Sequence, residues 1–178
     1  VMLLAGFDRR DAGMLWSLFR MSLGDRFLGS SLGMVWAVLA PLMLMGIFVF
    51  VFTFVFPSRL PEREGALPFV IWLVSGYAPW LGLSEGLSAA TTSVVGNAGI
   101  VKNVAFKSEL LPVVGAMLGL LPLCVGLTVI FLLQLVAGEG ISPSIVALPL
   151  MVGLQLVFVS GVGLFLGALN VFVRDTAL

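Results

Sequence analysis

Residues 32–56 of the chain are LGMVWAVLAPLMLMGIFVFVFTFVF, a run without a charged side chain. Phe alternates with other residues over 48–56, a period of two that a β-strand would also show. A membrane β-strand alternates apolar with polar residues because one face meets the lumen, whereas here both sets are apolar apart from Thr53. The run therefore predicts one membrane-spanning helix, with Pro41 and Gly46 as candidate kinks.

Three further segments have the length of a span. A helix rises 1.5 Å per residue and the hydrocarbon core of a bilayer is about 30 Å thick, so roughly 20 apolar residues cross it. Residues 67–90, 110–137 and 144–173 meet this requirement, and the last two are long enough to tilt. We predict an all-α integral membrane protein with four transmembrane helices.

The composition of the chain also indicates a membrane protein. Of its 178 residues, 60% are hydrophobic and 10% are charged, and the mean hydropathy is +1.19. Soluble domains have about 45–50% apolar and about 25% charged residues. Nine Lys+Arg and nine Asp+Glu are too few to cover a water-exposed surface. The composition therefore excludes a soluble enzyme, a disordered tail and a disulfide-stapled secreted domain.

Several kinds of site need residues that this sequence lacks. It has no histidine, which removes Ser-His-Asp triads and HExxH zinc sites. Its single cysteine, Cys124, permits no internal disulfide or cysteine-clustered metal site, and its apolar surroundings predict a buried side chain. The net charge is zero, so no basic excess is available to neutralise phosphates and nucleic acid is not expected as a partner. No GxxxxGK[ST] phosphate loop occurs, so any ATP dependence must come from a partner. We expect no catalytic residue, cofactor or metal.

The positions of Lys and Arg predict the orientation, because loops rich in these residues stay in the cytoplasm. Seven of the nine fall before the first span, between the second and third, or after the fourth: Arg9, Arg10, Arg20, Arg26, Lys102, Lys107 and Arg174. The other two, Arg59 and Arg63, are accompanied by Glu62 and Glu64. Both ends and the connection from Thr91 to Glu109 should be cytoplasmic, with residues 57–66 and 138–143 outside.

Residues 1–31 are predicted to form a cytoplasmic segment ahead of a transmembrane domain at 32–178. Four apolar residues recur in it at a helical spacing: Leu15, Phe19, Leu23 and Phe27. This pattern predicts an amphipathic helix along the membrane interface, with Asp11 as a cap and Trp16 as an anchor. The segment is not typical of a signal peptide, because its apolar start is short and its cationic residues follow it.

One carboxylate and several glycine pairs stand out within the spans. Glu85 is a charged residue in an apolar segment, so its side chain should face protein or water. Three roles are open for it: a structural role at the membrane interface, a place in a polar cavity, or a hydrogen bond between packed helices. Glycines four residues apart let helices approach closely. Four such pairs occur, of which at least two could arise by chance among 21 glycines: Gly29/Gly33, Gly82/Gly86, Gly115/Gly119 and Gly163/Gly167.

Four blocks of sequence follow one another in a distinctive order. They are RFLGSSLGMVW over 26–36 with Pro41 downstream, SGYAPW over 75–80 with SEGL over 84–87, NAGIVKNVAFKSELLP over 97–112, and ALNVFVRD over 168–175. Together, across about residues 16–175, they resemble the ABC type 2 export permeases for polysaccharides and polyol phosphates, which handle O-antigen, teichoic acid or capsule. The sequence departs from that pattern at Asn103, where lysine is usual, at Lys107, where proline is usual, and at the inserted Pro79.

The resemblance implies a homodimer of permeases with two separate ATPase subunits, in the bacterial cytoplasmic membrane, that exports a lipid-linked polysaccharide. It places ATPase coupling on the N-terminal helix and the loop after the second span, at Arg20, Arg26, Asn97, Lys102 and Phe106. Aromatic faces can pack on sugar rings, and the candidates for the translocation path are Trp36, Tyr77, Trp80 and Glu85. Interfacial anchoring is the alternative role for the three aromatic residues.

The family is expected to continue past Asp175 into a fifth span, re-entrant helices and a sixth span, so the chain is expected to be a C-terminally truncated fragment. Two other functions stay open. One is a polytopic membrane enzyme acting on lipid-linked sugars, although the chain has no histidine and no paired intramembrane acids for such chemistry. The other is a scaffold subunit without transport activity. Co-purification of an ATPase with the chain would favour a permease over such a scaffold.

Overall fold

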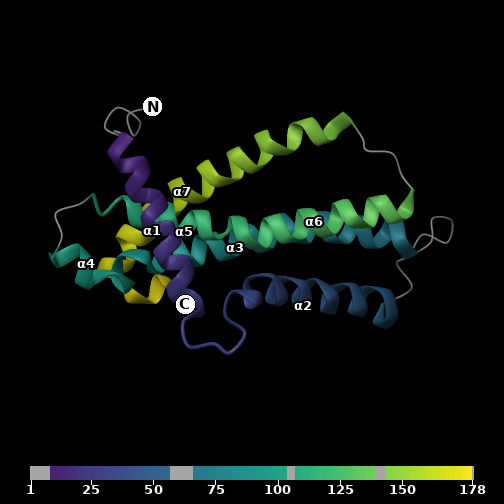
Figure 1. Ribbon diagram of the computed structural model, residues 1–178, viewed down its shortest axis with the longest axis horizontal. Coiled ribbons are helices and arrows are strands. Elements are labelled where there is room, and N and C mark those ends of the chain that lie inside the picture. The colour runs from purple at the N-terminus through teal and green to yellow at the C-terminus, as the bar shows by residue number, and fades with distance from the viewer. Residues whose placement is uncertain (1–8, 57–65, 104–106, 139–142, 178) are drawn as a thin grey trace.

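The computed structural model describes residues 9–56, 66–103, 107–138 and 143–177, and all regular secondary structure in these residues is helical (Figure 1). The α-helices are α1 Arg9–Phe27, α2 Trp36–Phe50, α3 Ala66–Gly96, α4 Ala98–Asn103, α5 Leu110–Leu118, α6 Leu120–Ala137 and α7 Leu148–Phe172. Short 3-10 segments lie at Gly33–Val35, Pro143–Ala147 and Arg174–Ala177, and Val51–Val55 forms a π-helix. The expected all-α fold is confirmed.

Four helical stretches are long and apolar enough to cross a membrane: Gly33–Val55, Leu67–Gly96, Leu110–Ala137 and Ile145–Phe172. The chain is therefore a multi-pass membrane protein. The alternating Phe residues of the first stretch are helical, as predicted, and end in the π-helix. The second stretch continues as helix through Thr91, so the connection that we expected from that residue begins only after Gly96.

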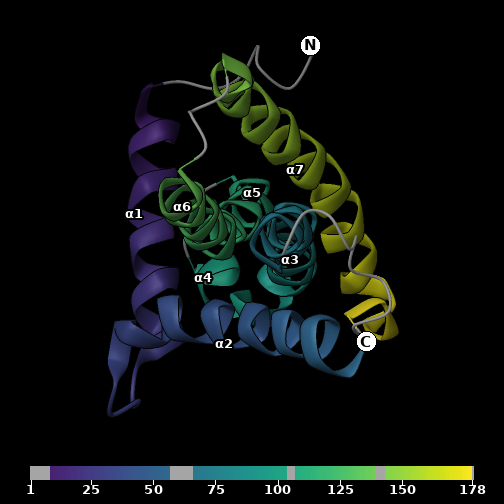
Figure 2. The same ribbon diagram turned by 90° about the vertical axis from the view of Figure 1, so that its right-hand side faces the viewer.

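The long helices form a central group and an outer group. Figure 2 shows α3, α5 and α6 in the middle, with α1, α2 and α7 around them. The central helix α3 packs against α5, α6 and α7, and α5 leads into α6 with only Gly119 between them. Pro79 lies inside α3, which continues past it as one helix.

Close approach of the central helices depends on the predicted glycine pairs. A Cβ added at Gly119 would lie 2.3 Å from the carbonyl oxygen of Gly82 and 2.8 Å from the backbone of Gly86, and one at Gly115 would lie 2.5 Å from Ala90. Gly163 and Gly167 of α7 face Ala90 and Pro112 in the same way. Three of the four pairs therefore lie at helix contacts, as their spacing predicted.

The fourth pair has a different role. Gly29 and Gly33 lie in the turn between α1 and α2 with φ of 84° and 51°, and an added Cβ would meet nothing within 4 Å at either residue. Their backbone is left-handed, a conformation in which glycine is favoured over residues with a side chain. The pair thus allows the chain to turn from α1 into the first span.

The outer faces of the helices are apolar. Large side chains on α2, α6 and α7 are exposed, among them Phe50, Leu132, Val157, Phe165 and Phe172. In a membrane-spanning protein such faces meet hydrocarbon or further protein. Cys124 is also exposed, so its predicted burial is wrong: α6 turns its neighbours Leu123 and Gly126 inward and leaves Cys124 outside.

Candidate functional site

The N-terminal helix α1 is held against the start of α5 by an apolar cluster. Leu18 packs with Leu110, Leu111 and Val114, each of which is almost completely buried. The predicted amphipathic helix is present. Its inner face contains Leu18, Met14 and Leu15 one turn before it, and the adjacent Phe19. Trp16 points outward, stacked on the Phe19 ring with centroids 5.6 Å apart.

An ion pair joins the same two regions. Lys107 Nζ lies 2.7 Å from Asp11 Oδ2, and the Asp11 side chain is only 14% exposed. Asp11 lies inside α1 and pairs with another part of the chain, so its predicted role as a helix cap is wrong. Lys107, at which the sequence departs from the permeases that it resembles, thus contacts α1.

A second ion pair joins the other end of α1 to α3. Arg26 Nη1 lies 2.5 Å from Glu85 Oε1, with the two side chains 38% and 34% exposed. The guanidinium carbon of Arg26 is also 5.9 Å from the centroid of the Phe27 ring. Glu85 therefore faces protein, as its position in an apolar span predicted, and its partner is a cation at the end of the amphipathic helix.

This ion pair borders a cavity of about 290 Å³ between the end of α1 and helices α2, α3 and α6. Its polar lining comes from Arg26, Glu85 and Ser84, and Trp36 lies in its wall. Apolar residues complete the lining: Phe27, Ala37, Ala40, Pro41, Leu44, Leu81, Leu121 and Pro122. The site can hold a group that combines a charged or hydroxylated part with an apolar part.

An aromatic groove lies farther along α2 and α3. Tyr77 stacks on Phe48 with ring centroids 4.0 Å apart, and a groove of about 490 Å³ runs beside them. The other aromatic walls are Phe52, Trp72 and Trp80, and Leu73, Ser75 and Gly76 complete the lining. Exposed ring faces beside a phenol and a hydroxyl suit the apolar faces and polar edges of a sugar.

The predicted path residues thus divide between two places. Trp36 and Glu85 line the cavity at the end of α1, whereas Tyr77 and Trp80 line the aromatic groove. The groove also contains three aromatic residues that were not predicted from the sequence: Phe48, Phe52 and Trp72. The signal available was their position on the faces of two successive spans, but which faces meet is not visible in the sequence.

The predicted coupling residues also lie apart. Arg20 is exposed on α1, and Arg26 is paired with Glu85. Asn97 sits between α3 and α4, where its Nδ2 donates to the carbonyl of Ser93 at 2.8 Å. Lys102 belongs to α4, although its side chain is not among those described, and Phe106 lies outside the described residues.

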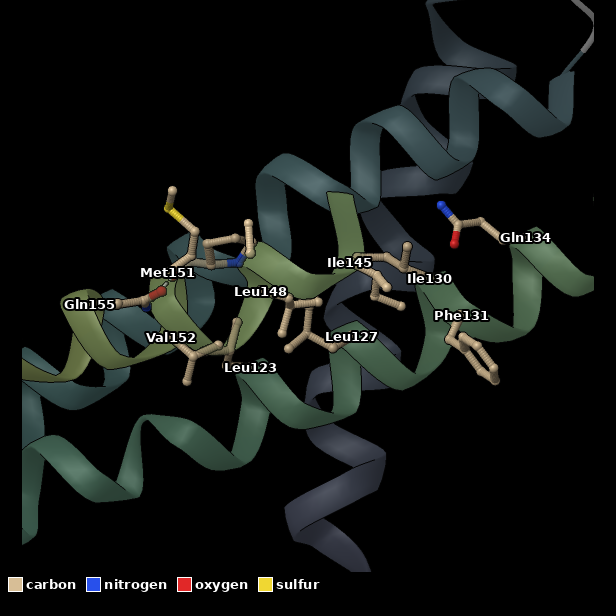
Figure 3. Close-up of a pocket in the computed structure, with 12 residues that line it drawn as sticks. Leu123, Leu127, Ile130, Phe131, Gln134, Ile145, Leu148, Met151, Val152 and Gln155 are labelled. Carbon is tan, nitrogen blue, oxygen red and sulfur yellow. Dashed lines mark hydrogen bonds between the residues drawn. The ribbon is translucent and has the colours of Figure 1, made fainter. Parts of the chain in front are cut away.

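A third cavity separates α6 from α7, which diverge toward the end of the molecule away from α1 (Figure 1). It has a volume of about 610 Å³, and Figure 3 shows mainly aliphatic side chains around it, with Gln134 and Gln155 as the amides. Gln155 Nε2 donates to the carbonyl of Pro79 on α3 at 3.0 Å. This bond between α7 and α3 was not predicted from the sequence.

Several known proteins resemble this chain over most of its length. No protein-family profile matches the chain. O-antigen export system permease protein RfbA of Myxococcus xanthus is 28% identical over 163 residues, which are 92% of this chain and 60% of that protein. Two proteins of the same name from Klebsiella pneumoniae are 30% and 26% identical, over 84% of this chain and 56% of theirs.

The chain spans little more than half the length of these relatives. The first alignment covers 163 of 178 residues, which leaves too few unmatched residues to omit any of the four candidate spans. The chain is therefore similar, over most of its length, to proteins named as permeases of O-antigen export systems.

Proposed function

We propose that the chain forms four spans of a permease that exports a lipid-linked polysaccharide across the bacterial cytoplasmic membrane. The similarity to O-antigen export permeases over 92% of the chain carries this proposal. The four candidate spans and the aromatic groove fit it, because a glycan path needs ring faces and hydroxyl partners within a membrane. The chain then acts as a transport subunit and performs no chemistry itself.

The energy for export is proposed to come from separate ATPase subunits on a permease homodimer. The sequence has no phosphate loop with which to bind ATP. The elements proposed to meet the ATPases are α1, α4 and the turn at Lys107, which carry most of the basic residues near the candidate spans. Both ends of the described chain are accordingly placed in the cytoplasm.

The orientation has a direct test. Single cysteines at Ser58 and Asn103, in a Cys124→Ala background, should react with an impermeant thiol reagent from opposite sides of the membrane. Ser58 is expected to react in intact cells, and Asn103 only after the membrane is opened. Labelling of both residues in intact cells would contradict the proposed topology.

The export function is tested with the complete permease and its ATPase. Deleting the permease gene should remove the glycan from the cell surface while its lipid-linked form accumulates inside, and an affinity-tagged permease should retain the ATPase on purification. Surface glycan that persists after deletion, or purification of the permease without an ATPase, would refute the proposal.

The glycan path is tested within the same system. Tyr77→Ala should lower export at matched membrane abundance, because it removes a ring face from the groove. Val157→Ala is the matched control, since Val157 is exposed on α7 and does not line this groove. Equal export by the two variants would remove the aromatic groove from the path.

A further inference from the structure

The apolar contact between α1 and α5 leaves the placement of α1 incompletely determined. Leu18 and its neighbours meet Leu110, Leu111 and Val114 through hydrophobic burial, and Val101 of α4 packs against the same cluster. Such burial is not directional. An apolar cluster by itself would therefore hold α1 near α5 without fixing its position along its own axis.

The Asp11–Lys107 ion pair fixes the position of α1 along its axis, because it requires two particular side chains to meet. Asp11 shares a helix face with Met14, Leu15 and Leu18, because these residues follow it by three, four and seven positions. The ion pair thus extends the apolar contact by one turn. With 14% of the Asp11 side chain exposed, solvent screens this carboxylate less than it would a surface group.

Lys107 also begins the turn that leads into α5, which starts at Leu110. Its carbonyl accepts a hydrogen bond from the Leu110 N–H at 3.0 Å. A displacement of Lys107 therefore displaces the start of α5, and the ion pair passes that displacement to α1. At its other end α1 is tied to α3 by Arg26 and Glu85, about 22 Å away along the helix at 1.5 Å per residue.

We infer that Asp11 and Lys107 are positioning residues that join α1 and the start of α5 into one unit, which moves together during the transport cycle. This inference rests on the proposed function for what the motion achieves, but the joining itself is a property of the fold. The ATPase-facing helix and a buried central helix then respond together to a force applied at either of them.

The test is a charge-swap cycle in the complete permease with its ATPase. Asp11→Lys and Lys107→Asp each place like charges together, and the double variant restores an opposite pair with the sign exchanged. Ser17→Lys is the control, because it adds a cation to an exposed position of α1 away from Lys107. Each single reversal should lower the glycan exported per ATP hydrolysed by about threefold or more, and the swap should restore it.

The placement of α1 is measured separately, so that its outcome does not depend on what is exported. Spin labels at Trp16 and Ser108, both exposed, report the distance between α1 and the start of α5 in a Cys124→Ala background. The distribution of distances should be narrow in the parent, broad in each single reversal and narrow again in the swap. An unchanged distribution in the single reversals would overturn the inference.

A chemical crosslink tests whether the contact persists through the cycle. Asp11→Cys and Lys107→Cys together, in the Cys124→Ala background, should be joined by a bifunctional thiol reagent with a short reducible spacer and should leave export active, because the two elements do not need to separate. Export that stops on crosslinking and returns when the spacer is reduced would show that they must separate, and would overturn the inference. Failure of the parent permease to export would refute the proposed function and leave the spin-label result standing.

Discussion

Asn170 Nδ2 on α7 donates a hydrogen bond to the backbone carbonyl of Thr91 on α3 at 3.0 Å. Both residues are buried, and 79 positions separate them in the sequence. The Asn170 Oδ1 in turn accepts from the Thr176 hydroxyl at 3.4 Å. One side chain therefore ties α7 to α3 and to the turn that follows α7.

Asn170→Ala should lower the stability of the membrane-embedded protein by about 0.6–2 kcal/mol, the range for an interhelical hydrogen bond in a bilayer. Asn170→Asp should cost more, because it removes the donor and buries a carboxylate against a carbonyl. Unfolding of purified protein in mixed micelles with increasing SDS measures both losses. Stability of the Asp variant equal to that of the Ala variant would contradict this explanation.

Gly119→Ala should disrupt the contact of α3 with the α5–α6 junction. Its Cβ would lie 2.3 Å from the Gly82 carbonyl oxygen, and the obstacle is backbone, which cannot rotate away. We expect a loss of at least about 1–3 kcal/mol, the usual cost of overpacking. Thermal unfolding in detergent measures it.

Gly161→Ala is the matched control for that substitution. It lies inside α7, and an added Cβ would meet nothing within 4 Å. Alanine is the better helix former, by up to about 1 kcal/mol in soluble helices, so this variant should equal or exceed the parent in stability. If both glycine variants lose stability equally, close packing is not the reason for Gly119.

Arg26→Ala should lower the amount of folded protein in the membrane, because it leaves the Glu85 carboxylate without its cation beside an apolar cavity. Adding Glu85→Gln should recover part of the loss by removing that charge. Arg26→Lys should keep the ion pair and most of the abundance. If Arg26 were only a positive anchor at the interface, Glu85→Gln would give no recovery, and quantitative immunoblotting of membranes distinguishes the two roles.

Thr53→Val should stabilise the protein by up to about 1 kcal/mol. The Thr53 hydroxyl is buried in the π-helix at the end of the first span and has no hydrogen-bond partner among the described residues. Valine keeps the shape and removes the polar group. Thr53→Ser is the control, since it keeps the hydroxyl and loses a methyl group, and the two should differ in thermal unfolding with valine the more stable. A less stable Val variant would show that the hydroxyl is bonded.

The helical character and the four spans could be predicted from the sequence, because both depend on local properties. Hydrocarbon cannot hydrogen-bond to the backbone, so an uncharged apolar run of sufficient length forms a helix. The alternating Phe residues of 48–54 are accordingly helical despite their strand-like period, and the helix ends before Phe56. Glu85 could likewise be expected to face protein or water, because a lone charge in lipid is costly.

The contacts between residues of different helices could not be predicted. They depend on how each helix is rotated about its axis and on which helices are neighbours. Gly29/Gly33 and Gly115/Gly119 have the same spacing, yet the first pair lies in a turn and the second in a helix contact. Cys124 lies outward although its surroundings in the sequence are apolar.

The ion pairs and hydrogen bonds between helices could be identified only from the tertiary structure, for the same reason. Asp11 is 96 positions from Lys107, and Asn170 is 79 from Thr91. No periodicity connects residues so far apart, and each is polar in a way that several local roles would explain. The sequence by itself determined what enters the membrane, through the free energy of transferring side chains to hydrocarbon. Packing of the helices decided which polar groups meet, because each must find a partner once water is excluded.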